Sequence, residues 1–484
     1  MSAIGSILSN DGSLKALNSL RQSSNTTNNL EAQLSSGKKI NSPADNPAGY
    51  ITAEGFTSQL NGLNQALSNA NQGVSLLQTA EGAINQQTSI VQKLNSIAVQ
   101  ASNGTQTPAE AQSLQNVVGQ LNSQVNTIAQ QTQFNNINLL NGSFSGVNFQ
   151  VGANNGQTIS LSIAGSTASD IGMQASQGVA SGSAMYGSNG SLESVYSASG
   201  GAFTSGSFAV NGSNGSASIN VASSTESAAS IASAVNKKTS STNVAAQATT
   251  QVTFKASGSN FSFKLGNGSA GSGQTNAVTV SATNTTSLLN SINNHTATTG
   301  ISAKTDASGN VVLTQSQGKN ISITNLTSGS LTNINGSGSL TGSASGASGL
   351  FQGKVQFQSD QSFNLGSNVA NIGLQTKSTL HSLSNINVST SSGAEKAINV
   401  IKYALQGLGA EGGKLGAVQQ RLQANVANNQ TTTQNLTSAR SVVQDANIPK
   451  VSEQLTQQQV LQQAGISALK NSTTLQQQYQ RLLP

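Results

Sequence analysis

The sequence contains no cysteine and no tryptophan, and only 5 of its 484 residues are prolines. The absence of cysteine excludes disulfide bonds, thiolate metal sites and cysteine catalysis. Charged residues make up 7% of the chain, whereas an ordinary globular protein carries roughly 25%. The formal net charge of +6 is not concentrated in any run of lysine and arginine, so we expect no nucleic-acid partner.

Long apolar runs are also missing. No stretch approaches the roughly 20 apolar residues that a membrane-spanning helix requires, so we expect no membrane insertion. The N-terminal segment has no cation before Lys15 and no continuous apolar core, and therefore does not read as a cleaved secretory signal. Export from the cell would need another route.

Residues suited to catalysis or metal binding are scarce. The two histidines, His295 and His381, lie in unrelated contexts, and the HExxH pattern of zinc proteases is missing. The 15 carboxylates are scattered, and no nucleophile elbow surrounds any serine. We expect no enzyme activity, no cofactor and no metal site.

A seven-residue apolar repeat runs through the first part of the chain. Its members are Phe56, Leu63, Ala70, Leu77, Ile84, Val91 and Ala98, with Leu60, Leu67 and Val74 four residues after the first three. This spacing predicts a coiled-coil helix, which at about 1.5 Å per residue would be roughly 65 Å long. After a break, Pro108 suits the first turn of an antiparallel return helix, whose stripe runs from Ala111 to Ile128.

The same signal returns near the C-terminus. The heptad there comprises Leu415, Leu422, Leu436 and Val443, with Val418 and Ala439 beside it. A shorter stripe lies nearer each chain end. The two stripes are Leu14, Leu17, Leu20, Leu30 and Leu34, and Val451, Leu455, Leu461 and Leu469. Because neither end can bury its apolar face alone, we expect the two ends to pack against each other.

The segment "LSSGKKINSPADNPAGY" separates the first stripe from the long seam. Gly37, Pro43 and Pro47 punctuate it, so we expect a corner between a terminal helix ending near Ser36 and a long helix beginning in the low fifties.

The centre of the chain, residues 181–380, is rich in Gly, Ser, Asn and Thr, and its short alternating runs predict strands. An internal repeat is visible at about 205–250 and 260–325, and each copy reads as a strand pair, a short helix and a further strand. The expected fold is mainly α at both termini, with long antiparallel helices in a coiled-coil bundle. A β-rich central region of two small α+β modules is inserted between them.

Four segments together resemble bacterial flagellin. They are "LSSGKKINSPADNPAGY", "GLNQALSNANQGVSLLQTAEGAINQ", "QTQFNNINLLNG" followed by "FQVGANNGQTISLSI", and the stretch from "LGAVQQRLQANVANNQ" to "LQQAGISAL". The resemblance implies a secreted, extracellular subunit that polymerises into the flagellar filament for swimming motility. It also implies three kinds of partner: other flagellin subunits, the flagellar type III export apparatus with an export chaperone, and the filament cap and hook-associated proteins.

The resemblance further implies nested domains. Residues 1–45 and 450–484 would form the filament core, with the two terminal stripes as assembly surfaces. Residues 46–180 and 381–449 would form an inner helical bundle carrying a β-hairpin, and residues 181–380 an outer region facing solvent. The corner at Gly37, Pro43 and Pro47 would join the first two layers.

One further binding surface is implied by the resemblance. "QKLNSIAVQ" is similar to the flagellin region that an innate immune receptor recognises, with Lys93 where the family commonly has arginine and Ile97 where it has leucine. Lysine lacks the planar fork of arginine, and Val117 stands where a receptor-binding flagellin has an acidic residue. We expect weakened or absent recognition.

Two other functions remain open at this level. A hook-filament junction protein shares flagellin-like ends, although we expect its ends to match less closely. A secreted adhesin or surface protein would explain the repeated β modules, but has no need to pair its extreme ends.

Overall fold

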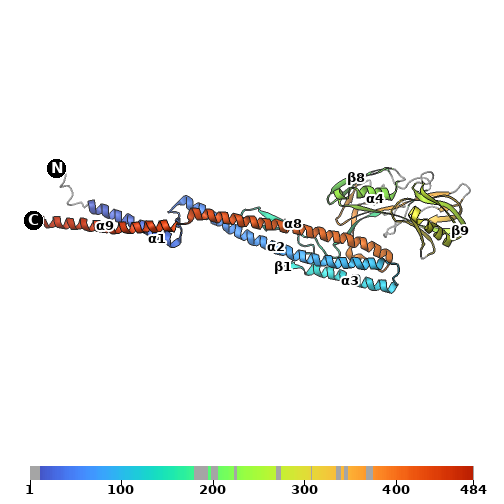
Figure 1. Cartoon of the computed structure of the whole chain (residues 1–484), viewed down its shortest axis with the longest axis horizontal. Helices are drawn as coiled ribbons and strands as arrows, with labels where there is room; N and C mark the ends of the chain where they lie inside the picture. The colour runs from blue at the N-terminus through green and yellow to red at the C-terminus, as the bar shows by residue number, and fades with distance from the viewer. Residues whose placement is uncertain are drawn as a thin grey trace. The chain divides into compact units, whose positions relative to one another are not determined.

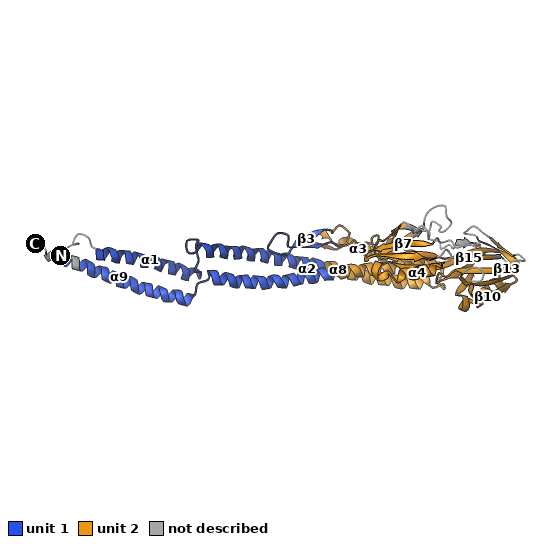
Figure 2. Ribbon diagram, turned by 90° about the horizontal axis from the view of Figure 1, so that it is seen from above, with its two compact units in different colours: residues 1–78, 145–162, 415–484 blue, residues 79–144, 163–414 orange. Residues whose placement is uncertain are grey.

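The computed structural model describes residues 11–178, 195–197, 205–222, 226–268, 274–306, 308–333, 339–342, 347–366 and 374–482. The start of the expected outer region, residues 181–194, and the chain ends, 1–10 and 483–484, lie outside the described residues. The chain divides into two compact units, shown in different colours in Figure 2. Each unit is described by itself.

Unit 1 combines residues 1–78, 145–162 and 415–484. Helices α1 (Asp11–Ser36) and α9 (Ile448–Leu482) lie side by side in it (Figure 1). The unit also holds the first part of α2 (Pro47–Ser102), the second part of α8 (Ser391–Gln444), and the hairpin of β3 (Val147–Gln150) and β4 (Thr158–Leu161).

The predicted seam of α2 is confirmed by burial. From Leu63 to Ala98 every member of the heptad line is buried, and Phe56 is half-buried. The helix is 56 residues long, or about 84 Å. On α8, Leu415 and Leu422 are buried and Leu436 and Val443 half-buried, so an apolar repeat of seven does predict which face packs.

The hairpin packs on both long helices of unit 1. The Asn69 side-chain amide donates to the Gln150 carbonyl over 3.1 Å, and the Asn429 amide donates to the Val151 carbonyl over 2.7 Å. A Cβ added at Gly73 would lie 3.0 Å from a Leu422 methyl group. The small residue at position 73 therefore lets the helices and the hairpin approach closely.

The start of α2 differs from the sequence prediction. The helix begins at Pro47 rather than in the low fifties, so Pro47 is its first residue and not part of the connecting loop. Proline fits a first helical position because its missing N–H would have no helical partner there, and its φ already matches the helix. Asn46 precedes it and accepts from the Gly49 N–H over 2.9 Å.

Unit 2 contains the remaining parts of α2 and α8, helix α3 (Pro108–Gln131), and the short strands β1 (Gln133–Phe134) and β2 (Ile137–Asn138). Helix α3 starts with a capping box in which Thr107 and Glu110 bond each other's backbone N–H groups. The buried Gln87 donates from its side-chain amide to the carbonyls of Val125 and Ser166. These two hydrogen bonds link α2 to α3 and to the segment after β4.

The rest of unit 2 is a β-rich region of antiparallel strands. In chain order its elements are β5 (Gly172–Gly178), β6 (Val195–Ser197), β7 (Gly206–Gly212), β8 (Gly215–Val221), α4 (Ala228–Asn236), α5 (Thr239–Thr242), β9 (Ala245–Gly268), β10 (Gln274–Ala282), α6 (Thr285–Asn294), α7 (Thr296–Thr299), β11 (Ile301–Thr305), β12 (Val311–Gln315), β13 (Ile321–Asn333), β14 (Ser339–Thr341), β15 (Ala347–Gln352), β16 (Lys354–Ser359), β17 (Asn364–Leu365) and β18 (Leu374–Ser382), followed by a short turn of helix, η2 (Leu383–Asn385). Along the main path the strand order is β6-β15-β13-β9-β16-β5-β18-β17-β7-β8. The fold class expected from the sequence is confirmed.

The internal repeat is visible in the order of these elements. Strands β7 and β8, helices α4 and α5, and the first part of β9 are matched by the second part of β9, β10, α6, α7 and β11. Asn236 exchanges two hydrogen bonds with the backbone of Ala246, of 2.9 and 2.7 Å, and Asn293 does the same with Ala303, at 2.8 and 2.7 Å. The predicted strand pair, helix and strand of each copy are therefore present.

The two modules share one strand, which the sequence did not predict. β9 is 24 residues long, and it closes the first module and opens the second. Each end of it belongs to a separate apolar core. A T-shaped aromatic pair marks each core: Phe208 with Phe357 at 5.9 Å, and Phe254 with Phe351 at 5.0 Å.

Candidate assembly surface

Helices α1 and α9 meet along a seam with heptad spacing. On α9 the half-buried and buried positions recur at alternating intervals of four and three residues. They are Val451, Leu455, Gln458, Gln462, Gly465, Leu469 and Ser472; Ser452, beside Val451, is also half-buried and lies outside this alternation. This alternation keeps one stripe facing a single partner helix, and α1 provides that partner within the chain.

Polar side chains bond across this seam at three levels. Ser13 and Ser472 lie 3.0 Å apart between their hydroxyl oxygens, the Ser23 hydroxyl donates to Gln458 Oε1 over 2.9 Å, and the Gln462 amide donates to Thr27 Oγ1 over 3.1 Å. Leu20 packs close to Gly465 in the same seam: a Cβ added at Gly465 would lie 3.6 Å from a methyl carbon of Leu20. The seam therefore has fewer apolar contacts than a leucine zipper.

The structure divides the predicted stripe residues into two sets. Six lie buried or half-buried: Leu17, Leu20, Leu30, Val451, Leu455 and Leu469. The other three are exposed: Leu14, Leu34 and Leu461. The sequence reasoning did not single out Val460 and Ile466, which are also exposed, at 60% and 54%. The sequence feature that could have identified them is their apolar character at positions outside the heptad stripe of α9.

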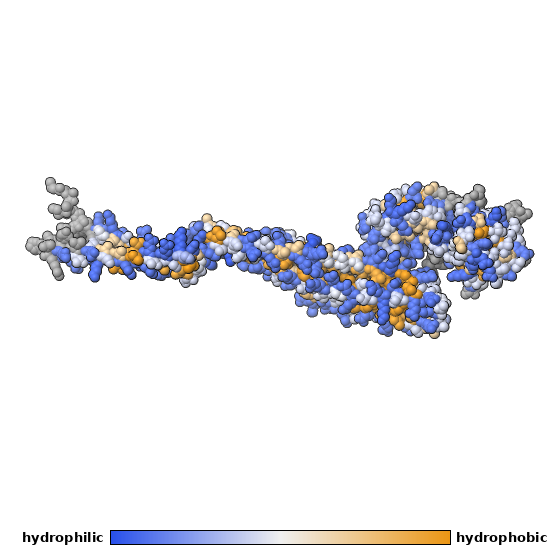
Figure 3. Space-filling model, in the orientation of Figure 1, coloured by the Kyte–Doolittle hydropathy of each residue, from blue (hydrophilic) through white to orange (hydrophobic). Residues whose placement is uncertain are grey.

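Apolar side chains thus reach the solvent on both terminal helices. In Figure 3 apolar residues show on the surface of the part formed by α1 and α9, among polar ones. At about 100° per residue, Val460 lies opposite the seam of α9, and Leu461 and Ile466 lie on its two flanks. Because a surface helix normally turns its apolar residues toward a packing partner, these three side chains are apolar surface of α9 that α1 leaves uncovered.

The loop after α1, which holds the predicted corner, is hydrogen-bonded to the loop after α8. Gly37, with φ of +69°, follows α1, and its carbonyl accepts from the Ala446 N–H over 2.9 Å. The Lys39 N–H donates to the Gln444 carbonyl over 2.8 Å, and Lys38 forms a β-bridge with Asp445. The segment after α1 is therefore bonded to the segment after α8, a pairing that the sequence reasoning missed.

Two side chains complete this corner. The Lys39 ammonium donates to the Val442 carbonyl over 3.1 Å in the last turn of α8, where a cation complements the helix dipole. Asp45 Oδ2 accepts from the N–H groups of Asn41 and Ser42, at 2.9 and 2.8 Å. These two bonds lower the pKa of Asp45 below its ordinary value. Pro43 is exposed within this loop.

The residues that correspond to the receptor-recognised region of flagellin lie on α2 and α3. The Lys93 side chain is exposed, the Ile97 side chain is only 7% exposed, and Val117 on α3 is 42% exposed. Lys93 and Val117 can therefore meet a partner directly, whereas Ile97 packs inside unit 2.

The two histidines occupy different elements. His295 links α6 to α7, and His381 lies in β18, where burial and the nearby Lys396 lower its pKa. Across the residues that the structure describes, no three histidine or acidic side chains gather as a metal-binding group. In the same part of the chain, no helix has the length and apolar character needed to cross a membrane.

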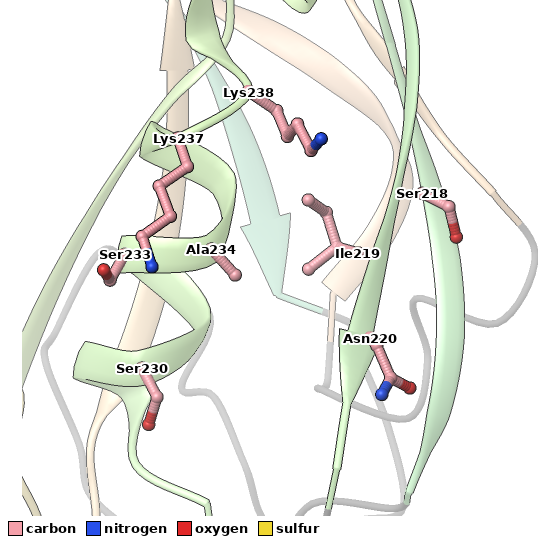
Figure 4. Close-up of a pocket in the computed structure, with 8 residues that line it drawn as sticks. All are labelled: Ser218, Ile219, Asn220, Ser230, Ser233, Ala234, Lys237 and Lys238. Atoms are coloured by element: carbon pink, nitrogen blue, oxygen red, sulfur yellow. The ribbon is translucent and has the colours of Figure 1, made fainter.

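A shallow hollow of about 370 Å³ lies between β8 and α4 (Figure 4). It is lined by Ser218, Ile219, Asn220, Ser230, Ser233, Ala234, Lys237 and Lys238. The small residues of α4 leave space beside the buried Ile219. None of these eight residues is a carboxylate or a histidine, so the hollow contains neither an acid–base pair nor a metal-ligand set.

Paired terminal helices with exposed apolar side chains, flanking an inserted β-rich region, define a class of self-assembling helical subunits. A family model of the bacterial flagellin N-terminal helical region matches residues 7–145, and a model of the bacterial flagellin C-terminal helical region matches residues 398–483. B-type flagellin of Pseudomonas aeruginosa is 31% identical over 503 residues, covering 98% of each chain. Flagellin B of Vibrio cholerae is 46% identical over 138 residues, which are 28% of this chain and 36% of that relative. The chain belongs to the bacterial flagellin family.

Among solved structures, FliC from Burkholderia pseudomallei aligns over 72% of this chain and 99% of its own, at 21% identity and a TM-score of 0.31. Flagellar hook associated protein-3 from Legionella pneumophila aligns over 80% of this chain and 97% of its own, at 12% identity and a TM-score of 0.35.

Family membership makes the protein a structural subunit of the bacterial flagellar filament. A flagellin match along 98% of the chain favours this role over the hook-filament junction protein and the adhesin considered above.

Proposed function

We propose that this subunit enters the filament by burying the exposed apolar side chains of α1 and α9 against neighbouring copies. The observation that carries the proposal is the position of Val460, Leu461 and Ile466, which surround α9 on the sides that α1 leaves open. Burying one such side chain contributes roughly 1.5–3 kcal/mol. Identical contacts repeated between subunits generate an open helix when the rotation does not close.

The terminal helices fold fully only on assembly in this proposal. Their shared seam carries the polar pairs Ser13 with Ser472 and Thr27 with Gln462, which lowers the apolar area that the isolated pair buries. Helices that bury little are marginal alone, and the ordering cost is then offset by burial between neighbours.

The nested organisation is part of the same proposal. Residues 1–45 and 450–484 form the filament core, 46–180 and 381–449 the inner layer, and 181–380 the outer, solvent-facing layer. The bonded corner at Gly37 and Ala446 joins the core to the inner layer. Pro43 stiffens that corner, and Pro47 fixes the start of α2 next to it, because each proline restricts its backbone φ.

Secretion and partners complete the proposal. The subunit leaves the cell through the flagellar type III export apparatus, with an export chaperone, and is added to an extracellular filament between the hook-associated proteins and the cap. The scarcity of charge and the absence of disulfides suit passage as an unfolded chain.

The test replaces Val460, Leu461 and Ile466 together with glutamine, which keeps the helix propensity and leaves the seam untouched. Polymerisation of the purified full chain is followed by light scattering and sedimentation. The matched control replaces Gln459 and Gln463, exposed polar residues of the same helix, with alanine. We expect the triple variant to stay soluble at concentrations where the control and the native chain form filaments.

A deletion of residues 449–484 gives the stronger test. Filament formation by the deleted chain, or by the triple variant at the native concentration, would overturn the proposal. Circular dichroism of the native chain and the triple variant, both as monomers, shows whether the substitutions change the helix content of the unassembled chain.

A further inference from the structure

We propose that Asn155 is a site of spontaneous deamidation, through which the subunit gains a negative charge in the hairpin loop. The reaction needs only water, and it is independent of the assembly contacts proposed above. Asparagine is a thermolabile residue, and a following glycine, which has no side chain, leaves its backbone nitrogen open to attack the asparagine Cγ. The structure distinguishes Asn155 from the other asparagines that precede a glycine.

The chain has seven Asn-Gly pairs among the described residues. They begin at Asn61, Asn103, Asn141, Asn155, Asn211, Asn214 and Asn267. Sequence alone ranks them equally, because each asparagine is followed by a residue without a side chain.

Four of the seven are held by their surroundings. Asn61 lies inside helix α2, where the backbone is bonded turn by turn. Asn141 Oδ1 accepts from the N–H and the hydroxyl of Ser143, at 3.0 and 2.7 Å. Asn214 donates to the Ser240 carbonyl, and Asn267 is 4% exposed and donates to the Thr299 carbonyl over 2.7 Å.

Asn211 is held by the sheet. It lies in β7, paired in register with Ser216 of β8, and the following Gly212 is packed so closely against Thr242 that a Cβ would not fit. Ring closure there would have to break the hairpin.

Asn155 has none of these restraints. It lies exposed in the loop between β3 and β4, and no hydrogen bond among the described residues uses its side chain or the Gly156 N–H. A Cβ added at Gly156 would meet no atom within 4 Å. The loop around it is braced, since the Val151 N–H donates to the Gln157 carbonyl over 2.9 Å and the Gln150 amide donates to the Asn154 carbonyl over 2.6 Å.

The chemistry balances without any other reagent. The Gly156 backbone nitrogen attacks Cγ of Asn155 and forms a new C–N bond. The Cγ–Nδ2 bond breaks, and Nδ2 leaves as ammonia with the proton from the Gly156 nitrogen. Water then adds to either carbonyl of the cyclic imide and opens it to aspartate or to isoaspartate.

The product changes the loop. Either form adds one negative charge to a chain of formal charge +6. The isoaspartate form also routes the backbone through the side-chain carbon, within the loop that the Val151–Gln157 bond closes. Asn103, exposed after α2 and followed by Gly104 in open space, meets the same criteria, so it is expected to react as well.

The test incubates the full-length chain, as filaments and as depolymerised subunits, in neutral and mildly alkaline buffer. Peptide mass mapping at intervals then measures conversion at each asparagine. We expect conversion at Asn155 to exceed that at Asn61, Asn141 and Asn267 several-fold, and to quicken at alkaline pH because the attacking nitrogen must lose its proton.

Two variants keep the result interpretable. Asn155→Gln retains an amide but disfavours ring closure, and should abolish conversion in that peptide while leaving Asn103 unchanged. Gly104→Ala, where an added Cβ meets no atom within 4 Å, should slow Asn103 several-fold and leave Asn155 unchanged. Conversion at Asn155 no faster than at Asn267, or undiminished conversion of the Asn155→Gln peptide, overturns the proposal.

Discussion

The Asn429 side-chain amide donates a hydrogen bond to the Val151 carbonyl over 2.7 Å, and so ties helix α8 to the hairpin of unit 1. Asn429 occupies the heptad position seven residues after Leu422 and is 5% exposed. A polar residue on an otherwise apolar line is thus satisfied by one specific backbone group.

Replacing Asn429 with alanine should therefore destabilise the monomer by about 1 to 3 kcal/mol, because the buried Val151 carbonyl loses its donor. Chemical denaturation of the full chain measures the difference. Asn428→Ala is the matched control, since Asn428 is exposed on the same helix. Equal stability of the two variants would contradict the role of this bond.

Gly73 and Gly55 should respond oppositely to alanine. Both lie in α2, where alanine gains roughly 0.5–1 kcal/mol over glycine. At Gly55 an added Cβ meets no atom within 4 Å, but at Gly73 it would lie 3.0 Å from Leu422 and 3.4 Å from Phe149. Overpacking costs about 1–3 kcal/mol, so Gly55→Ala should raise the free energy of unfolding and Gly73→Ala lower it. Thermal unfolding of both variants checks the sign, and a Gly73→Ala chain as stable as Gly55→Ala would be inconsistent with the close approach.

Asp45 should make the corner sensitive to acid. Its pKa is lowered by the backbone N–H of Asn41 first and that of Ser42 second. A carboxylate whose folded pKa lies below its unfolded value, about 3.9, stabilises the fold above that value, and this contribution is lost as the pH falls through the folded pKa. Nuclear magnetic resonance titration of Asp45 should give a midpoint below the ordinary one. Asp45→Asn should remove the corresponding change in local hydrogen exchange, and an ordinary midpoint would show that the two bonds do not persist in solution.

The innate immune receptor should respond weakly to this chain. Lys93 is exposed but cannot form the planar contacts of arginine, and Val117 offers no carboxylate. A cell reporter assay on purified monomer should show several-fold lower potency than a receptor-binding flagellin. The double variant Lys93→Arg with Val117→Glu should recover part of the difference. Full potency of the native chain would refute the prediction.

Local patterns allowed much of the fold to be predicted. The α2 heptad from Leu63 to Ala98 is buried as expected, since a period of seven places one face of a helix against a partner. The order of strands and helices in the two modules followed from their repeated sequence. The start of α2 was misplaced because proline can either end a loop or begin a helix.

The sequence by itself determined the helical ends, the β-rich insertion and the absence of thiol chemistry, because composition and periodicity are local properties. Only the tertiary structure decided that β9 serves both modules, that Gly37 bonds Ala446 and that Val460 and Ile466 are left uncovered by α1. These features depend on contacts between residues that can be hundreds of positions apart in the chain. Local sequence patterns predict neither which backbone groups bond across such distances nor which face of a helix its partner covers.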